Sequence, residues 1–235
     1  MYGNLVVVPA EPGYWPVVDR ELVLTVDDLL VEEGRIAPFG PTETSDAALG
    51  RFGNLLLTGG DPELWLPAQV GEVVRWWLTN TASTWVVNLG LAGARLKLVG
   101  GDSGRVEPQE FGESVVLGPS ERAVVDGLVE RPGELGVEHR TPERVYRLAV
   151  VTVAGEGAGS GAGEAFAVLG HAPELVAERQ GLDRWVAAEP DKVLALVAQM
   201  DDPAALPDGA GPVALAARCT PRWSATSPGA VPGAG

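Results

Sequence analysis

Residues 93–129, GARLKLVGGDSGRVEPQEFGESVVLGPSERAVVDGLV, decide the fold of this 235-residue chain. Three aliphatic runs, 94–99, 115–117 and 123–129, are separated by clusters of glycine, aspartate, proline and serine. Short apolar runs between turn-forming residues predict β-strands. The run 94–98 alternates apolar and basic residues, which predicts a strand with one face in solvent. Residues 123–125 are continuously apolar and predict a strand buried on both faces.

The same pattern continues on both sides of this stretch. Further strands are predicted at residues 22–26, 55–57, 73–78, 85–89, 134–139 and 145–153. No helical periodicity alternates with these runs, so we expect two packed antiparallel sheets. The predicted fold class is therefore all-β, a β-sandwich, with Greek-key connectivity inferred from that class.

The predicted sandwich occupies residues 19–154, and the rest of the chain divides into four segments. Residues 1–18 hold an apolar run, 5–8, and a turn-rich link, while the glycines of 155–170 predict a flexible linker. Residues 171–200 predict a short helix that begins near Pro173 and ends near Gly181, followed by an orphan strand. Residues 201–235 are rich in alanine, glycine and proline, which predicts a disordered tail.

The composition argues against several kinds of partner. A formal net charge of -15 disfavours nucleic acid and anionic membrane surfaces, because such binding depends on clustered lysine and arginine. Cys219 is the single cysteine, so no intrachain disulfide can form. The first residues lack the basic and long apolar regions of a signal peptide, and no apolar run approaches the length of a membrane helix. We therefore expect a cytoplasmic location for the chain as written.

Four motifs point to a known family. They are RFGNLLLTGG (51–60), GEVVR (71–75) before a hydrophobic strand and Thr79-Asn80, GARLKLVGGD (93–102), and LGPSERAVVD (117–126). Together they resemble the middle cupredoxin domain of the multicopper oxidases, over residues 52–129. The resemblance implies a cupredoxin-like sandwich. In three-domain members, it further implies, the middle domain carries no copper and spaces the first and third domains, and none of the quoted residues is a copper ligand.

Both ends of the chain are similar to the family in the same order. MYGNLVVV (1–8) resembles the last strand of the first domain, and residues 192–200 resemble the segment before the third. RCTPRWSATSPG (218–229) stands where relatives carry a heavy-metal-binding insert, and suitable codons read in a neighbouring frame can encode the relatives' residues. We therefore expect a remnant of the first domain, a middle domain and, after a frameshift, a lost third domain.

The resemblance and the residue counts together predict a structural fragment of an oxidase. A blue-copper site takes two imidazoles, a thiolate and usually a weak axial ligand, and the whole chain holds two histidines and one cysteine. We expect no catalytic, cofactor-binding or metal residues, no cofactor bound by this chain alone and no activity in isolation, copper being implied only for the family. The expected partners are complementing oxidase domains or further copies of the chain. The alternative is a stand-alone β-sandwich interaction module that binds a partner protein.

Several polar residues are candidates for other kinds of site. Gly101-Asp102-Ser103-Gly104 matches the nucleophile motif of trypsin-like proteases, but both histidines follow the serine, so a strand-connecting turn is the better interpretation. His139 is expected to close a strand and bond loose backbone groups, and His171 to lie on the surface. Cys219 is expected to be exposed and without function.

The tryptophans and the acidic pairs complete the set of candidates. Four tryptophans could line a ligand groove, but at least two are expected in the core; they are Trp65, Trp76, Trp77 and Trp85. Trp76 and Trp77 are adjacent, so one of them should be exposed or covered by an attached segment. Three acidic pairs are candidates for a cation site or a glycosidase dyad: Asp27-Asp28, Glu32-Glu33 and Asp201-Asp202. Adjacent residues of a strand point to opposite faces, so we expect these pairs to form solvated surface instead.

Overall fold

The computed structural model describes residues 4–38, 46, 50–155, 161–190, 194–197 and 222–225. The chain divides into two compact units, one of Met1–Ala37 with Phe52–Leu175 and one of Pro38–Arg51 with Val176–Gly235. The sandwich lies entirely in the first unit.

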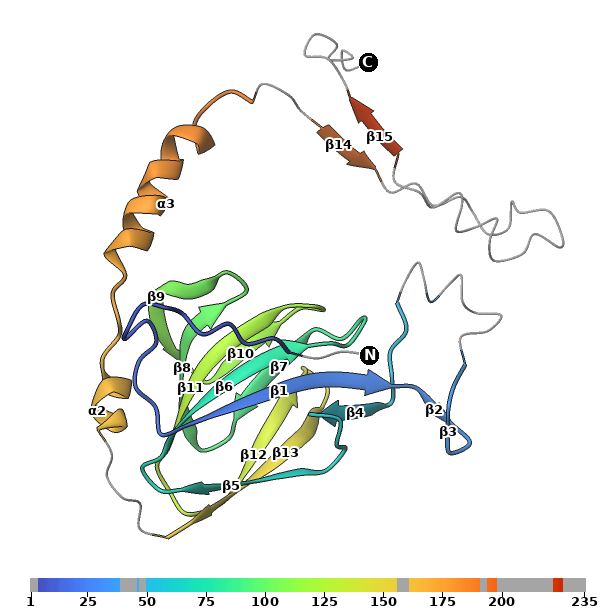
Figure 1. Cartoon of the computed structure of the whole chain (residues 1–235). Coiled ribbons are helices and arrows are strands. Elements are labelled where there is room, and N and C mark those ends of the chain that lie inside the picture. The colour runs from blue at the N-terminus through green and yellow to red at the C-terminus, as the bar shows by residue number, and fades with distance from the viewer. Residues whose placement is uncertain are drawn as a thin grey trace, which may run out of the picture. The chain divides into compact units, whose positions relative to one another are not determined.

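Two sheets form the first unit (Figure 1). The six-stranded sheet has the order β4-β1-β6-β11-β8-β9, with β4 Leu55–Thr58, β1 Arg20–Leu29, β6 Val73–Asn80, β11 Arg122–Val129, β8 Ala94–Gly101 and β9 Gly104–Gly112. The five-stranded sheet has the order β10-β7-β12-β13-β5, with β10 Ser114–Leu117, β7 Val87–Leu91, β12 Gly133–Arg140, β13 Val145–Ala154 and β5 Leu64–Gln69. Strand pairs are antiparallel except β1 with β6 and β13 with β5. The all-β sandwich is confirmed.

All nine predicted strands are present, and two longer ones were missed. Strand β5 contains Pro67 and strand β9 contains Pro108, and proline lowers the strand signal of any run. Both strands lie at sheet edges, where a residue without an N–H is tolerated. A short hairpin follows β1; its strands, β2 Val31–Glu32 and β3 Arg35–Ile36, have two residues each.

The main core lies between the two sheets. Alternate residues of β6 and β11 point into it, including Val74, Trp76, Leu78 and Val125. The other face of β6 is also covered, since Val73 and Arg75 are as deeply buried as their neighbours. The six-stranded sheet therefore carries a further layer on the side that faces away from the five-stranded sheet, which we call the outer face.

Helix α2, Ala162–Ala167, corrects the prediction of a flexible linker over residues 155–170. Ala162 and Phe166 lie on one side of this six-residue helix and both are buried, packed against Val73 and Leu128 on the outer face. Residues 156–160 lie outside the described part of the chain. The glycines hid this helix because the anchoring Phe166 is the one large apolar residue between Gly155 and Val168.

The predicted wet face of β8 is confirmed at Arg95, whose side chain is 48% exposed, but it is wrong at Lys97. Lys97 has no exposed surface, because α2 and its following residues cover it. Residues 5–8 also differ from the prediction, since they form no strand. They run across the outer face, as described below.

The second unit contains most of α3, Pro173–Val186, and an antiparallel pair of strands, β14 Leu194–Val197 and β15 Arg222–Ala225. The predicted helix start at Pro173 is confirmed, but the helix runs through Gly181 to Val186 instead of ending there. The orphan strand predicted before residue 200 is paired with β15, which lies in the predicted disordered tail. The rest of that tail is outside the described residues. In the described part of the chain no helix has the length and apolarity needed to cross a membrane.

Candidate functional site on the outer face of the six-stranded sheet

A buried cluster of three charged side chains lies on the outer face. Alternation along the strands brings Arg75 of β6, Asp126 of β11 and Lys97 of β8 to the same side of neighbouring strands. Arg75 Nε donates to Asp126 Oδ1 at 2.8 Å and Arg75 Nη2 donates to Asp126 Oδ2 at 2.9 Å. Both side chains are 1% exposed. The paired bonds fix the two planar groups against each other in a site closed to water.

Lys97 carries the third charge of the cluster and holds α2. Its Nζ donates to the carbonyl oxygens of Ala165 and Val168 at 3.1 and 3.2 Å. These carbonyls belong to the last turn of the helix, whose partial negative charge favours a cation. Burial lowers the pKa of Lys97, and nearby Arg75 lowers it further, while Asp126 acts in the opposite direction. Burial likewise raises the pKa of Asp126, against the effect of the Arg75 hydrogen bonds.

The link that precedes β1 covers the other side of the cluster. Pro16 accepts a hydrogen bond at its carbonyl oxygen from Arg75 Nη2 at 2.8 Å. The Trp15 ring lies edge-on to the Trp77 ring with centroids 5.3 Å apart, and the Arg75 guanidinium lies 5.5 Å from the Trp15 centroid. A Cβ on Gly100 would lie only 2.6 Å from Trp15 Cη2, so this strand position must be glycine for the indole to seat. The turn-rich link is thus a fitted cover.

Arg105 joins this entry segment to the exit segment that follows α2. Its guanidinium stacks over the Tyr14 ring at 4.1 Å from the centroid and forms an ion pair with Glu174. The Arg105 N–H donates to the Tyr14 hydroxyl at 3.4 Å, and Gly104 leaves the space that this hydroxyl fills. Tyr14 and Glu174 therefore meet on one strand, β9, although they lie far apart in sequence. We call Tyr14, Arg105 and Glu174 the clasp.

Further polar contacts fix the exit segment to β9. Gly170 N–H donates to Gln109 Oε1 at 2.7 Å, and Ala172 N–H donates to Glu107 Oε2 at 2.9 Å. His171 Nδ1 lies 3.2 Å from Glu107 Oε1. The His171 side chain is exposed, as predicted. The segment before α3 is therefore held by hydrogen bonds to its backbone.

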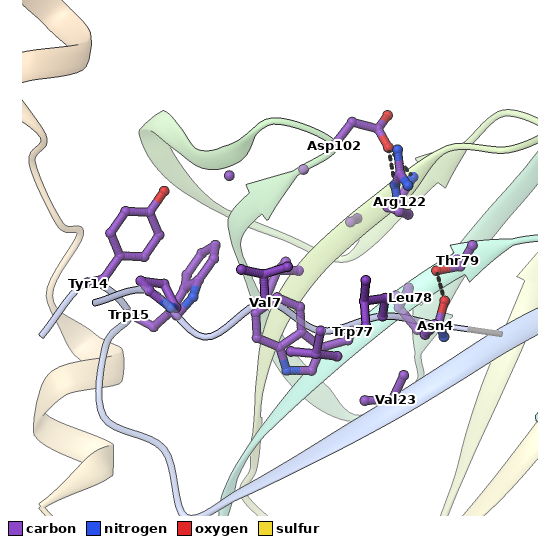
Figure 2. Close-up of a pocket in the computed structure, with 17 residues that line it drawn as sticks. Asn4, Val7, Tyr14, Trp15, Val23, Trp77, Leu78, Thr79, Asp102 and Arg122 are labelled. Atoms are coloured by element: carbon purple, nitrogen blue, oxygen red, sulfur yellow. Dashed lines mark hydrogen bonds and ion pairs between the residues drawn. The ribbon is translucent and has the colours of Figure 1, made fainter. Parts of the chain in front are cut away.

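A hollow of about 430 Å³ lies beside the Trp15 cover. Its floor is apolar and comes from Val23, Trp77 and Val124, while the Asp102–Arg122 ion pair stands at its rim. Figure 2 shows residues 4–9 passing over this floor, with Asn4 bonded to the Thr79 hydroxyl. Trp76 lies in the core and Trp77 lies under these covers, so the expectation that one of the pair would be exposed or covered by an attached segment is confirmed in its second form.

His139 is a candidate copper ligand, because the resemblance implies copper for the family. It is 1% exposed, and its Nδ1 accepts the Asn88 N–H at 3.0 Å, as a strand-closing histidine was expected to do. Its ring stacks on Tyr146 and meets the edge of Trp85. Burial lowers its pKa. His171 lies on the other sheet at Glu107, so the two imidazoles do not form one ligand set, and the residues fit a packed core better than copper.

The remaining candidates fall in ordinary positions. Ser103 lies exposed in the β8–β9 turn, and Glu32 and Glu33 are exposed at the β2–β3 hairpin. Asp28 accepts a hydrogen bond from the Gly53 N–H, so it has a structural role and the Asp27-Asp28 pair is not simply solvated. Trp65 is 55% exposed on the edge strand β5, whereas Trp85 is partly buried against His139. Cys219 and Asp201-Asp202 lie outside the described residues. Among the described residues, no three acidic, histidine or cysteine side chains gather as a metal site.

Sequence reasoning missed every residue of the charged cluster and the clasp. One signal was present: Arg75 and Asp126 each interrupt an apolar run that otherwise reads as buried on both faces. Two opposite charges in such runs indicate a buried ion pair, because an unpaired charge is too costly there. No comparable signal exists for Arg105, whose partners lie in segments without strand periodicity.

Solved copper proteins share this sandwich. The multicopper oxidase of Pseudomonas thermotolerans matches at 29% identity with a TM-score of 0.52, over 62% of this chain and 35% of that chain. The copper nitrite reductase of Nitrosomonas europaea matches at 20% identity with a TM-score of 0.53, over 69% of this chain and 60% of that chain. A laccase-like multicopper oxidase from Ochrobactrum matches at 19% identity with a TM-score of 0.52, over 60% and 32%.

The comparisons also show how far the similarity extends. No protein-family model matches the chain, and no curated protein matches it in sequence. The chain spans about a third of the length of the multicopper oxidases that it matches. The first unit thus has the cupredoxin fold and resembles a multicopper oxidase middle domain, as the motifs predicted.

Proposed function

We propose that this chain is a copper-free middle domain of the multicopper oxidase type, whose work is to hold the segments on either side of it in a fixed geometry. Its likeness to the Pseudomonas thermotolerans oxidase supports this proposal, because the matched part is 35% of that chain. A domain of that size accounts for one part of such an enzyme. Oxidation of a substrate belongs to the whole assembly and not to this part.

The clasp is the observation that carries the proposal. Arg105 contacts Tyr14 before the sandwich and Glu174 after it, from a single strand. Gly100 and Gly104 make room for Trp15 and Tyr14, and Lys97 and Phe166 anchor α2. A simple tether needs none of these contacts, whereas a spacer needs its entry and exit directions to be set.

The donor groups support the copper-free part of the proposal. When bound, type 1 copper supplies one-electron transfer through a thiolate and two imidazoles. Here Nδ1 of His139 already accepts a backbone N–H, and the His171 ring lies beside Glu107. A type 1 copper site needs a second imidazole and a thiolate beside the first imidazole. Among the described residues, neither histidine ring has such neighbours.

Copper loading tests this part. The purified chain is incubated with Cu(II), desalted, and assayed for bound metal and visible absorption, with Cys219→Ser as the control for adventitious binding through the single thiol. We expect far less than one copper per chain and no intense blue thiolate-to-copper band in either protein. One tightly bound copper per chain with that band in the parent protein contradicts the proposal.

The second candidate is a stand-alone module that binds a partner protein. The exposed indole of Trp65 on an edge strand favours it, because exposed aromatic side chains and open strand edges are common in binding surfaces. The two functions differ in one property. A binding module needs its exposed strand edge and does not need the clasp. Breaking the clasp should therefore leave partner binding intact if the chain is a binding module, but not if it is a spacer.

A further inference from the structure

Residues 4–9, which we call the strap, have the properties of an unpaired strand. The strap contains four consecutive aliphatic residues, Leu5 to Val8. Leu5, Val6 and Val7 line the hollow, where Figure 2 labels Val7. Leu5 is 91% exposed, Val7 74% and Val8 83%. Valine-rich runs favour an extended backbone, and such a run is rarely left in water without a partner.

The strap backbone has donors and acceptors that the described residues leave open. With the described residues, the main-chain groups of Leu5 to Val8 form no hydrogen bond, and the polar anchor of the strap is the Asn4 side chain on Thr79. Open N–H and C=O groups on an apolar run are a template for pairing with another strand. Pro9 has no N–H, so the template ends there.

The charge distribution indicates which strand can pair with it. Residues 4–10, NLVVVPA, carry no charge, although the chain has a net charge of -15. Two straps can therefore meet without bringing like charges together, and an antiparallel pair of identical strands satisfies a two-fold axis. The side chains of Leu5 and Val8, 91% and 83% exposed, add apolar area that a second copy would cover.

We infer that two copies of this chain associate through antiparallel pairing of their straps on the outer faces of their six-stranded sheets. Four residues form a short ladder, so the dimer is weak and reversible. Mutual repulsion of the acidic bodies opposes it, and salt relieves that repulsion, because the screening length falls to about 8 Å at physiological ionic strength. Association therefore rises with protein concentration and with salt.

Sedimentation of the full chain, in reductant so that Cys219 cannot cross-link, tests this inference. Val7→Pro removes a backbone donor, and Val7→Thr keeps the backbone and the β-branched shape. The matched surface control is Val116→Lys, at an exposed valine on the five-stranded sheet. Unchanged melting temperatures establish that each variant is folded.

The expected result is a salt-promoted dimer whose association constant falls roughly ten-fold or more in Val7→Pro, since a two-fold dimer suffers the change twice. Val7→Thr and Val116→Lys keep the association constant within a few-fold of the parent. A strictly monomeric parent at high concentration and high salt overturns the inference. So does a dimer that survives Val7→Pro, or one that Val116→Lys abolishes. The copper assay is independent of these outcomes, so the proposed function stands or falls separately.

Discussion

Arg75 and Asp126 form a doubly hydrogen-bonded ion pair on the side of the sheet where solvent would normally lie, with both side chains 1% exposed. The pair survives there because Trp15, Pro16 and α2 cover it. The segments around the sandwich are therefore part of its folding unit. Their removal would expose charged groups that are paired in a dry site.

Asp126→Asn should destabilise the fold strongly. The substitution removes the buried counter-charge of the Arg75 guanidinium and the Lys97 ammonium, and leaves Arg75 only the half-exposed Glu21 at 4.0 Å. Breaking a buried pair costs about 3–5 kcal/mol of unfolding free energy. Asp102→Asn is the matched control, because the Asp102–Arg122 pair is exposed and such pairs contribute at most about 1 kcal/mol. Urea unfolding measures both. Equal losses in the two variants would show that the outer face is wetter than described.

Phe166→Ala should loosen α2. Phe166 is 1% exposed and packs with Ala162 against the outer face, so its truncation should cost about 3 kcal/mol or more, as for other buried aromatics. Val168→Ala, two residues later and 64% exposed, is the control and should change stability by less than about 0.5 kcal/mol. The free energies of unfolding compare the two. A negligible loss for Phe166→Ala would restore the interpretation of 155–170 as a free linker.

Gly100→Ala should displace the Trp15 cover. The new Cβ would lie 2.6 Å from Trp15 Cη2 and 2.9 Å from the carbonyl oxygen of Gly104, and overpacking of this kind costs about 1–3 kcal/mol. Gly163→Ala serves as the contrast, because nothing lies within 4 Å of its added Cβ and alanine favours a helix. Tryptophan fluorescence should shift to the red in Gly100→Ala alone. Identical spectra in the two variants would contradict the seating of Trp15 on this glycine.

The stability of the sandwich should fall as the pH drops below about 6.5, the ordinary pKa of histidine, because burial lowers the pKa of His139. Below pH 6.5 the His139 imidazole is protonated in the unfolded chain but stays neutral in the folded chain, because its pKa there is lower. Between these two pKa values, a falling pH therefore favours unfolding. Protonation would also place a hydrogen on Nδ1, which now accepts the Asn88 N–H. His139→Phe should flatten this part of the profile of unfolding free energy against pH, and His171→Gln should not. An unaltered slope in His139→Phe would assign the effect to other groups.

The sandwich was predictable and its outer layer was not. Period-two alternation and turn residues located nine strands and placed Trp76 and Trp77 on opposite faces, because these signals are local. Lys97 reads as solvent-exposed by the same alternation. Its burial depends on a helix that lies 65 or more residues later in the chain, as its 68-residue separation from Ala165 shows.

The clasp shows the same limit more plainly. Arg105 is 91 residues from Tyr14 and 69 from Glu174, and neither partner lies in a periodic run. Periodicity predicts only a β-sandwich, whereas the family motifs indicate more narrowly a cupredoxin-like domain. They did not identify which side chains hold its flanking segments, because none of the quoted motifs includes Tyr14, Phe166 or Glu174.

We propose that the sandwich holds its entry and exit segments in a fixed relation, and a distance measurement tests this most directly. Spin labels at Glu11→Cys and Leu169→Cys, both exposed, in a Cys219→Ser background report the separation of the two segments by pulsed electron resonance. We predict a narrow distance distribution that broadens in Arg105→Ala and stays narrow in Arg122→Ala, whose guanidinium pairs with Asp102 outside the clasp. A broad distribution in the parent protein, or one that Arg105→Ala leaves unchanged, would contradict the account.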